Sequence, residues 1–352
     1  MKTLSIGTIQ LDAPVVQAAL SGYSDAPMRR LALEYGCPYT INEVVLDRFV
    51  AEGGRKMRRM LAIGAEDHPV AGQLMGSEPV QFGEAAAELV DLGYDAIDIN
   101  FGCPVRKVLG RCRGGFLLST PPVACEIIRR VCDSVAGRVP VTVKMRRGTD
   151  DTPESERHFF TILDAAYALG CAAVTVHGRS VVQRYVGPCS WPFLAKVKAH
   201  VGDRVLLGSG DLFTAADCLR MLEQTGIDGV SIARGAIGNP FIFNEVRELL
   251  AGRPLPDAPS IAEQRAAIRR HMDLMASVYG ETRARVLFRK FGVRYSELHP
   301  CHEDVKTAFV QVRTPDDFGL VVERWYADAD CYPPVQRRAR PEALVAAGAT
   351  MG

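Results

Sequence analysis

Polar or glycine-rich residues follow six short apolar runs along the chain, at positions where strands would end. In a barrel of parallel strands these ends meet on one face, which is where such proteins hold their active sites. A solvated loop residue is the alternative at any one position, but six successive strand ends of this kind together predict a lined pocket. The positions are Gln73, Asn100, Lys144, His177, Gly208-Ser209-Gly210-Asp211 and Ala233-Arg234-Gly235.

The last two of these segments predict a phosphate site. Phosphates in such barrels commonly bind the loops after the seventh and eighth strands. Gly208, Gly210 and Gly235 would let backbone amides approach an anion, and Arg234 would add positive potential. Tight turns are the alternative explanation for the glycines, but their presence on both expected loops favours phosphate.

The elements that would position these residues alternate regularly. Eight candidate strands rich in Val, Ile and Ala are separated by amphipathic stretches of helical length, as expected for parallel strands buried on both faces. Eight such units in about 240 residues predict an α/β fold of the (β/α)8 TIM-barrel type, with a doubly wound sheet as the alternative. The candidate strands are 15–20, 39–45, 70–75, 96–100, 141–145, 173–177, 204–208 and 229–233, and the candidate helices are 26–35, 47–60, 79–92, 121–135, 154–169, 191–200, 215–224 and 240–250.

The pattern changes after a Pro-rich linker at 253–260. Ser260 and Glu263 have the spacing of a capping box, and only helical stretches follow. We therefore expect a catalytic barrel over residues 1–252, a small all-helical domain over 260–328 and a disordered tail over 329–352. The helical stretches are 261–279, 283–297, 303–310 and 315–327.

Composition excludes several classes of protein. The 352 residues are 47% hydrophobic and 24% charged with a net charge of +1, which excludes disordered and fibrous chains. No apolar run approaches the ~20 residues of a membrane span, and the N-terminus has no apolar export signal. The ten cysteines form no C-x-x-C pair, which argues against a zinc or iron–sulfur site. We expect a cytoplasmic monomer with reduced thiols, no metal and no membrane contact.

The charge is unevenly distributed. Between Ile261 and Tyr295 eight Arg or Lys residues face three acids, a local balance of +5 that leaves −4 for the rest of a chain with a total of +1. Such asymmetry is typical of a domain that binds phosphates of a nucleic acid, and ordinary solvated helix faces are the alternative. Further basic clusters occur at 55–59 and 106–113.

Several blocks, in order, resemble a known family. Asn100-Phe-Gly-Cys-Pro104, followed by Lys107-Val108 and Gly115-x-Leu-Leu118, is similar to the signature of tRNA-dihydrouridine synthases, which are flavin enzymes with a (β/α)8 barrel and a helical C-terminal domain. The resemblance extends from about Ala18 to Tyr326. Its other blocks are Gln73–Gly76, Val143–Arg146, Val176–Arg179, Gln183–Gly187 and Asp228–Pro240.

The resemblance implies FMN as cofactor, NADPH as reductant and tRNA as substrate. Uridines would be reduced to 5,6-dihydrouridine by a hydride from reduced FMN to C6 and a proton from Cys103 to C5. Cys112, in the same loop, is the alternative proton donor. Inert packing suits the cysteines on helical or apolar segments, namely Cys125, Cys132, Cys171 and Cys218.

The resemblance also implies roles for the remaining site residues. Lys144 would hold the negative charge of the reduced flavin, and His177 and Gln73 would contact its ring. Asn100 and Arg179 would position substrate or flavin. The other expected flavin contacts are Ala19, Leu20, Ser209, Gly210, Asp211, Ala233, Arg234 and Gly235, and the expected tRNA contacts are Arg283, Arg289 and Lys290.

Two segments depart from the family pattern. Ala18-Ala-Leu-Ser-Gly22 replaces Ala-Pro-Met-Ala-Gly, although Asp25 and Arg29 stay in register, and Ser209-Gly-Asp211 replaces Asn-Gly-Asp. Both leave main-chain donors in place, so we expect FMN to bind, while the modified nucleotide stays open.

Three alternative functions stay open at this point. The chain could be a flavin oxidoreductase acting on another RNA, or on a free small molecule of dihydropyrimidine or dihydroorotate type. A basic helical domain argues against the small molecule, which needs no such surface. It could also be a non-catalytic RNA-binding module, but the intact set of Cys103, Lys144 and His177 argues against that.

Overall fold

The computed structural model describes residues 3–327, 331–332, 335 and 337. Most of the tail expected to be disordered therefore lies outside the described residues. Among the helices that are described, none is long and apolar enough to cross a membrane.

Eight parallel strands close into a barrel, which confirms the predicted (β/α)8 fold and excludes the open, doubly wound sheet. Each strand pairs with the next, and β11 pairs with β3 to complete the ring. The strands are β3 (Val15–Gln17), β4 (Thr40–Ile41), β6 (Val70–Met75), β7 (Ala96–Phe101), β8 (Val141–Arg146), β9 (Ala173–His177), β10 (Leu206–Ser209) and β11 (Gly229–Ile232).

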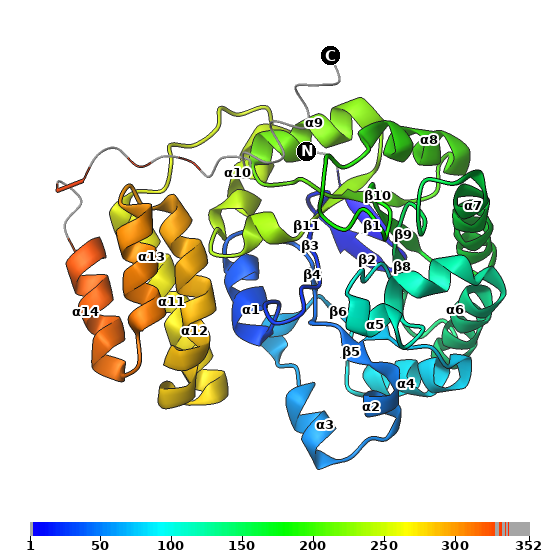
Figure 1. Cartoon of the computed structure of the whole chain (residues 1–352), viewed down its shortest axis with the longest axis horizontal. Coiled ribbons are helices and arrows are strands. Elements are labelled where there is room, and N and C mark those ends of the chain that lie inside the picture. Colours follow the sequence, from blue (N-terminus) through cyan, green and yellow to red (C-terminus); the bar gives the residue numbers. More distant parts are fainter. Residues whose placement is uncertain (1–2, 328–330, 333–334, 336, 338–352) are drawn as a thin grey trace.

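Helices surround this barrel, as Figure 1 shows in a view along its axis. Their buried faces pack against the outward-pointing residues of the strands, such as Val15, Ile97 and Val174, in one large apolar core. The surrounding helices are α1 (Ala26–Glu34), α4 (Pro79–Asp91), α6 (Pro121–Val135), α7 (Pro153–Ala168), α8 (Trp191–Val201), α9 (Ala215–Thr225) and α10 (Phe241–Leu250).

Two predicted elements are each split in the structure. The predicted strand 39–45 divides into β4 and β5 (Val45–Leu46), because Asn42 between them bonds with its side chain to Arg29 and Tyr94. The predicted helix 47–60 divides into α2 (Asp47–Ala51) and α3 (Arg55–Met60). Gly53 and Gly54 separate the two helices with φ angles of 68° and 96°, a left-handed conformation that glycine adopts without strain.

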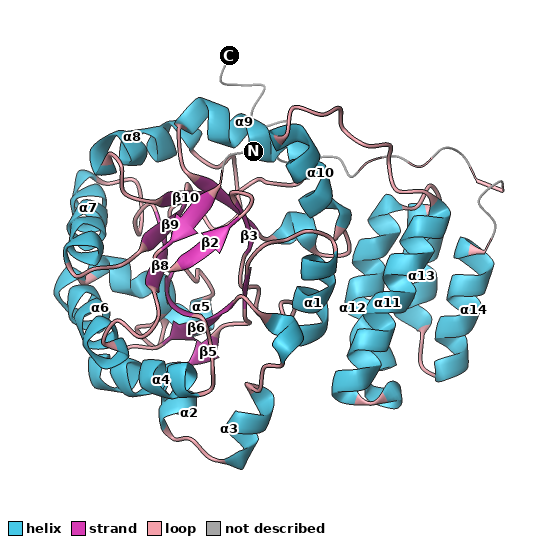
Figure 2. Ribbon diagram, turned by 180° about the vertical axis from the view of Figure 1, so that it is seen from behind, coloured by secondary structure: helices cyan, strands magenta, loops and turns pink. Residues whose placement is uncertain are grey.

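A hairpin at the N-terminus was not predicted. Strands β1 (Leu4–Ile6) and β2 (Ile9–Leu11) pair antiparallel, and their apolar side chains pack with Val16 and Leu207 inside the barrel. The hairpin covers the end of the barrel that faces the viewer in Figure 2, opposite the carboxyl ends of the strands. Alternation over three residues is too short to distinguish from a loop in the sequence.

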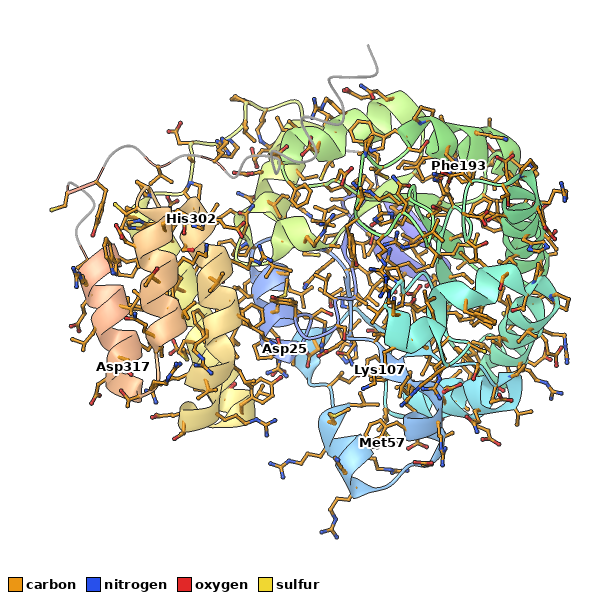
Figure 3. The ribbon with its side chains drawn as sticks, in the orientation of Figure 1. Asp25, Met57, Lys107, Phe193, His302 and Asp317 are labelled. Atoms are coloured by element: carbon orange, nitrogen blue, oxygen red, sulfur yellow. The ribbon has the colours of Figure 1, made fainter. Side chains whose placement is uncertain are left out.

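The C-terminal region is entirely helical over its described residues, as predicted, and packs against α1 of the barrel (Figure 1). Ser260 and Glu263 form the predicted capping box at its first helix. Tyr279 donates a hydrogen bond of 2.9 Å to Asp25 at the start of α1, and Arg270 pairs with Glu34 at its end. Figure 3 labels Asp25 at this junction. The helices are α11 (Ile261–Tyr279), α12 (Glu281–Tyr295), α13 (His302–Gln311) and α14 (Pro315–Tyr326).

Short helices complete the chain. One α-helical turn and one 3-10 helix lie in the loop after β7, where the candidate proton donor is found. These elements are α5 (Arg106–Leu109) and the 3-10 helices η1 (Ala65–Asp67), η2 (Gly114–Ser119), η3 (Arg234–Ala236) and η4 (Ser296–Leu298).

Candidate active site

A cavity of about 400 Å³ opens at the carboxyl ends of the strands, where the sequence predicted a pocket. It collects residues from the carboxyl ends of five strands, β6 to β10, and from loops at the same end of the barrel, including those after β3 and β11. The predicted site residues that line it are Ala19, Leu20, Gln73, Asn100, Cys103, Lys144, His177, Ser209, Gly210, Asp211, Ala233 and Arg234. Gly235 and Arg179 do not line it, and both lie behind its wall.

A buried carboxylate fixes the floor of the cavity. Asp98 accepts a hydrogen bond of 2.6 Å from Gln73 Nε2 and one of 2.5 Å from Thr142 Oγ1. Gln73 Oε1 in turn accepts from Asn100 Nδ2 at 2.7 Å, and Asn100 Oδ1 accepts from the Gly102 amide at 2.9 Å. This chain of bonds orients both side-chain amides, because each amide oxygen and nitrogen has a defined partner.

Sequence reasoning missed Asp98. It lies within an apolar run of β7 and two residues before Asn100, so both side chains point into the barrel. An acid inside a buried strand is itself a signal of function, since an unpaired carboxylate would be costly there. Burial raises the pKa of Asp98, and hydrogen bonds from Thr142 and Gln73 oppose the rise.

Lys144 lies on β8 directly opposite Asn100 on β7. Desolvation lowers the pKa of its ammonium to about 8, the attraction of Asp98 opposes this shift, and the nearby charge of Arg146 adds to it. A lysine with this pKa is mostly charged at neutral pH, and an anion beside it would hold that charge to higher pH. Lys144 is therefore suited to respond to negative charge that develops in the cavity.

His177 ends β9 and is held in one tautomer. The Arg179 amide donates to His177 Nδ1 at 3.1 Å, so the proton of the neutral ring is on Nε2. Desolvation and the surrounding cations, Lys144 first among them, keep the pKa of His177 well below its ordinary value. The ring is thus neutral, and it offers an N–H donor rather than a positive charge.

Arg179 lies beneath the cavity instead of lining it. Its side chain has no exposed surface, and Nη2 donates to Asp211 Oδ1 and Oδ2 at 2.7 and 2.8 Å. Its Nε donates to the Gly187 carbonyl at 2.9 Å. Through Nε and Nη2, Arg179 thus joins the loops after β9 and β10. Arg179 therefore lies behind the wall of the cavity, and its expected role in positioning substrate or flavin stays a prediction.

The two glycine-rich loops form a cradle. Gly210 has a φ of 118°, and a Cβ there would lie 2.5 Å from Cys189 Sγ and 3.3 Å from His177 Cε1. A Cβ on Gly235 would lie 2.1 Å from the Leu212 carbonyl, so glycine lets the loop after β11 touch the loop after β10. Gly235 thus shapes the cradle from behind, while Arg234 faces the cavity.

Cys103 lies on the opposite side of the cavity, in the loop after β7. The Gly115 amide donates to the Cys103 carbonyl at 3.1 Å, and Gly114 has a φ of 59° in close contact with Cys103. Arg146 Nε donates to the Gly102 carbonyl at 2.9 Å, and its charge interacts with Cys103. The thiol therefore has a fixed position in a positive environment.

The alternative proton donor, Cys112, does not line the cavity. It is exposed, with a φ of 55°, in the turn after α5. Cys171 and Cys218 are buried, and Cys125 and Cys132 are partly buried in the helical layer, as expected for packing residues. Of these six cysteines, only Cys103 lines the cavity, so its position favours it as the proton donor.

Aromatic and cationic residues surround the mouth of the cavity, and sequence reasoning gave most of them no role. The Arg234 guanidinium lies 4.6 Å from the centroid of the Tyr185 ring and 5.1 Å from that of Phe213. The Arg146 guanidinium lies 5.3 Å from the centroid of Tyr185, which is 51% exposed. Arg294 of α12 also lines the cavity, so the C-terminal helices contribute to its wall. The signal available for Tyr185 was its place inside the family block that begins at Gln183.

The cations of the C-terminal helices are largely engaged within the protein. Lys290 Nζ donates to the Gly22 carbonyl and lies 5.3 Å from the centroid of the Tyr23 ring, so it joins α12 to the barrel, and its expected contact with tRNA stays a prediction. Arg283 and Arg289 stay available, because within the described part of the chain Arg283 has only the Tyr279 ring and Arg289 only a carbonyl of its own helix. The other engaged cations are Arg265 with the Ala327 carbonyl, Arg270 with Glu34, Arg285 with Glu281 and Arg294 with Glu297.

The fold and cavity define a class of protein, the barrel enzymes that bind a ligand at the strand ends. Solved structures of this fold include a 2-naphthoyl-CoA reductase complex (TM-score 0.56, 12% identity, 72% of this chain) and histamine dehydrogenase from Rhizobium sp. 4-9 (TM-score 0.54, 15% identity, 77% of this chain). The chain spans about half the length of each, covering 52% and 50% of them.

The family model of dihydrouridine synthase matches residues 16–329, and the chain belongs to this family. A probable tRNA-dihydrouridine synthase of Mycobacterium tuberculosis (strain H37Rv) is 35% identical over 91% of this chain and 84% of its own. Another, of Rickettsia conorii, is 33% identical over 89% and 93%. A tRNA-dihydrouridine synthase B of Xanthomonas axonopodis is 32% identical over 93% and 96%.

Proposed function

We propose that this chain is a tRNA-dihydrouridine synthase, an oxidoreductase that uses FMN and NADPH to reduce uridines of tRNA to 5,6-dihydrouridine. The observation that carries the proposal is the cavity itself, in which Cys103 and the set of Gln73, Lys144 and His177 line one space. The relatives bear the name of this activity over nearly the whole length of the chain.

The residues of the cavity fit FMN. A volume of about 400 Å³ is within the range of cofactor pockets. The cradle of Gly210 and Gly235 lets backbone approach a phosphate, and Arg234 supplies positive charge beside it. Buried Arg179 also keeps one donor, Nη1, without a hydrogen-bond partner among the described residues. An anion at these loops would satisfy such a donor.

The flavin ring would contact Gln73, Lys144 and His177. When bound, FMN supplies the hydride that reduces C6 of the base. Lys144 would hold its ammonium beside the ring, where a positive charge favours reduction, and negative charge beside it would raise its lowered pKa toward the ordinary range. His177 would donate a hydrogen bond from Nε2 to the flavin ring without adding a positive charge.

Cys103 donates the proton that C5 of the uracil requires. The S–H bond of the thiol and the C5=C6 π bond of the base break, the former π pair forms the C–H bond at C5, and the electron pair of the S–H bond stays on sulfur. Arg146 stabilises the resulting thiolate, since its charge interacts with Cys103 and its position is fixed by the Gly102, Ser180 and Arg184 carbonyls. A solvent proton then restores the thiol.

The target uridine would leave its stack to reach the cavity, because C5 and C6 are not accessible inside a folded tRNA. Tyr185 at the mouth offers an exposed ring on which a base can stack. Asn100 positions the base from the floor, and Arg283 and Arg289 of α12 hold the backbone outside.

Two measurements test the proposal together. Purified protein is expected to show the absorbance bands of a flavin, released without a covalent bond and identified as FMN. Dihydrouridine mapped in tRNA from a deletion strain is expected to disappear and to return with the intact gene but not with Cys103→Ala. A colourless protein that takes up no FMN, or unchanged tRNA in the deletion strain, would contradict the proposal; a flavoprotein inactive on tRNA would point to a small-molecule substrate.

A further inference from the structure

A short basic helix projects from the barrel. Helix α3 lies outside the ring of barrel helices in both Figure 1 and Figure 2, on the side toward the C-terminal helices. It is anchored by Met57, which is labelled in Figure 3, and by Leu61, both buried. Its sequence Arg-Lys-Met-Arg-Arg-Met contains four cations and no acid. The arm that carries α3 is thus held by apolar contacts and presents cations to solvent.

Three of these four cations have no partner within the described part of the chain. Arg58 pairs with Glu88 at 3.0 Å, whereas Arg55, Lys56 and Arg59 are exposed and form no ion pair or side-chain hydrogen bond with any residue that the structure describes. Like charges gathered on one helix repel one another unless an anion binds. This differs from the C-terminal helices, where most cations are engaged by carboxylates or carbonyl groups.

A second group of exposed cations lies at the rim of the cavity. The segment Phe101–Thr120 contains four Arg or Lys residues and no acid. Arg106, Lys107 and Arg111 are exposed and make no ion pair with the residues that the structure covers. Val105, the residue before α5, itself lines the cavity, so this group begins at its edge. Lys107 is labelled in Figure 3, on the same side of the molecule as Met57.

The loop that contains α5 interacts with the helix that precedes α3. Arg113, which follows α5, interacts electrostatically with Asp47 at the start of α2, the helix that leads into α3. The cavity lining also includes Val44, three residues before α2. The exposed cations of α5 thus begin at one edge of the cavity, and α2 leads from the same edge to the cations of α3.

We infer that α3 and α5 form the surface that binds the tRNA backbone beside the target nucleotide, on the barrel side of the cavity. The ligand is a polyanion, because six exposed cations on two segments match several phosphates rather than one. The inference rests on the proposed function. The charge count alone would place the phosphate contacts on the C-terminal helices. The inference places some of them on the barrel.

A salt titration of binding tests this surface. Holoenzyme with Arg55→Ala, Lys56→Ala and Arg59→Ala, and a second variant with Arg106→Ala, Lys107→Ala and Arg111→Ala, would be titrated with an unmodified tRNA transcript at several salt concentrations. Each phosphate that is no longer neutralised lowers the slope of log affinity against log salt by about one unit, so each variant is expected to fall by about two to three units. Flavin content and NADPH oxidation by oxygen should stay unchanged in the α3 variant.

A matched control removes the same charge elsewhere. Arg129→Ala, Arg130→Ala and Arg157→Ala take three cations from α6 and α7, on the side of the barrel away from the C-terminal helices (Figure 1). This variant is expected to bind like the parent. Parental slope and affinity in both basic variants, or an equal fall in the control, would overturn the inference. Failure of the parent holoenzyme to bind any tRNA would instead contradict the proposed function.

Discussion

Arg179 and Asp211 form a buried ion pair, in which Nη2 donates to both carboxylate oxygens, and the pair joins the loops after β9 and β10 behind the proposed phosphate cradle. Asp211 has a φ of 58°, a conformation that costs energy for a non-glycine residue, and its Oδ2 also accepts from the Cys189 amide at 2.8 Å. The pair therefore fixes the shape of the loop that contains Ser209 and Gly210. In the proposed function the pair would position the residues that are expected to contact FMN.

Arg179→Ala should weaken FMN binding and destabilise the protein. Removing one partner of a buried pair leaves the other charge uncompensated, at a cost of about 3–5 kcal/mol in the free energy of unfolding. Arg179→Lys should recover only part of this loss, because an ammonium lacks the planar fork. Denaturant unfolding and FMN titration measure the two effects. Arg129→Ala, at a solvent-exposed pair, is the control and should leave the free energy of unfolding close to that of the parent.

Cys103→Ala should separate the two halves of the reaction. Reduction of bound flavin by NADPH should continue at the parental rate, because the thiol is not needed for it. Reduction of tRNA should fall by about 10²–10⁴-fold, the usual contribution of a general acid. Stopped-flow absorbance follows the first step, and quantified dihydrouridine follows the second. Cys112→Ala is the matched control from the same loop, and a larger loss in that variant would reverse the assignment.

The lowered pKa of Lys144 predicts that the rate of flavin reduction changes near pH 8. Its ammonium is present below about pH 8 and is lost as the pH rises through that value, so reduction of the flavin by NADPH should slow above it. Lys144→Met should be slower throughout and should lack this inflection, whereas Lys144→Arg should keep its charge to higher pH. Rates of flavin reduction measured from about pH 6 to about pH 10 distinguish them. A parental inflection in Lys144→Met would assign the titration to another group.

The same shift predicts a stability effect in the protein without flavin. The folded pKa of Lys144, about 8, lies below its ordinary value of 10.5, so the unfolded chain binds more protons between these values. Stability contributed by this site is therefore lowest below pH 8 and rises between 8 and 10.5. Lys144→Met should stabilise the flavin-free protein at neutral pH, and the difference from the parent should shrink toward pH 10.5. Paired urea titrations at several pH values measure that difference.

The lining of the cavity could be predicted because barrel geometry brings the strand ends together. Lys144 and His177 lie at the carboxyl ends of buried strands, and in a barrel of parallel strands all of these ends lie at the same end of the barrel. Asp98 was missed because the run around it was treated as apolar, although a single acid in such a run requires polar partners. Gly53-Gly54 marked in the sequence the point where the predicted helix 47–60 breaks. The exposed basic arm that results could not be predicted, because it depends on which residues of α3 are buried against the barrel.

Charge counts could not distinguish exposed cations from engaged ones. The pair of Arg270 and Glu34 joins residues that are 236 positions apart, and Lys290 contacts the carbonyl of Gly22 from a different part of the fold. Both contacts depend on how the C-terminal helices pack against α1. The local balance of +5 predicted a phosphate-binding region, and that remains a prediction, but only the packing shows which cations are accessible.

Lys290 and the pair of Arg283 and Arg289 should therefore behave differently when replaced. Arg283→Ala with Arg289→Ala should weaken tRNA binding and lower its salt slope by about one unit for each phosphate that is no longer neutralised, with flavin content unchanged. Lys290→Ala should mainly reduce stability, since it removes the bond to Gly22 and the interactions with the Tyr23 and Phe291 rings, which are each typically about 0.5–1 kcal/mol. Thermal unfolding and tRNA titration of the two variants side by side measure this contrast. If Lys290→Ala keeps parental stability but shows a lower salt slope, Lys290 contacts phosphate after all, and the junction with Gly22 opens when tRNA binds.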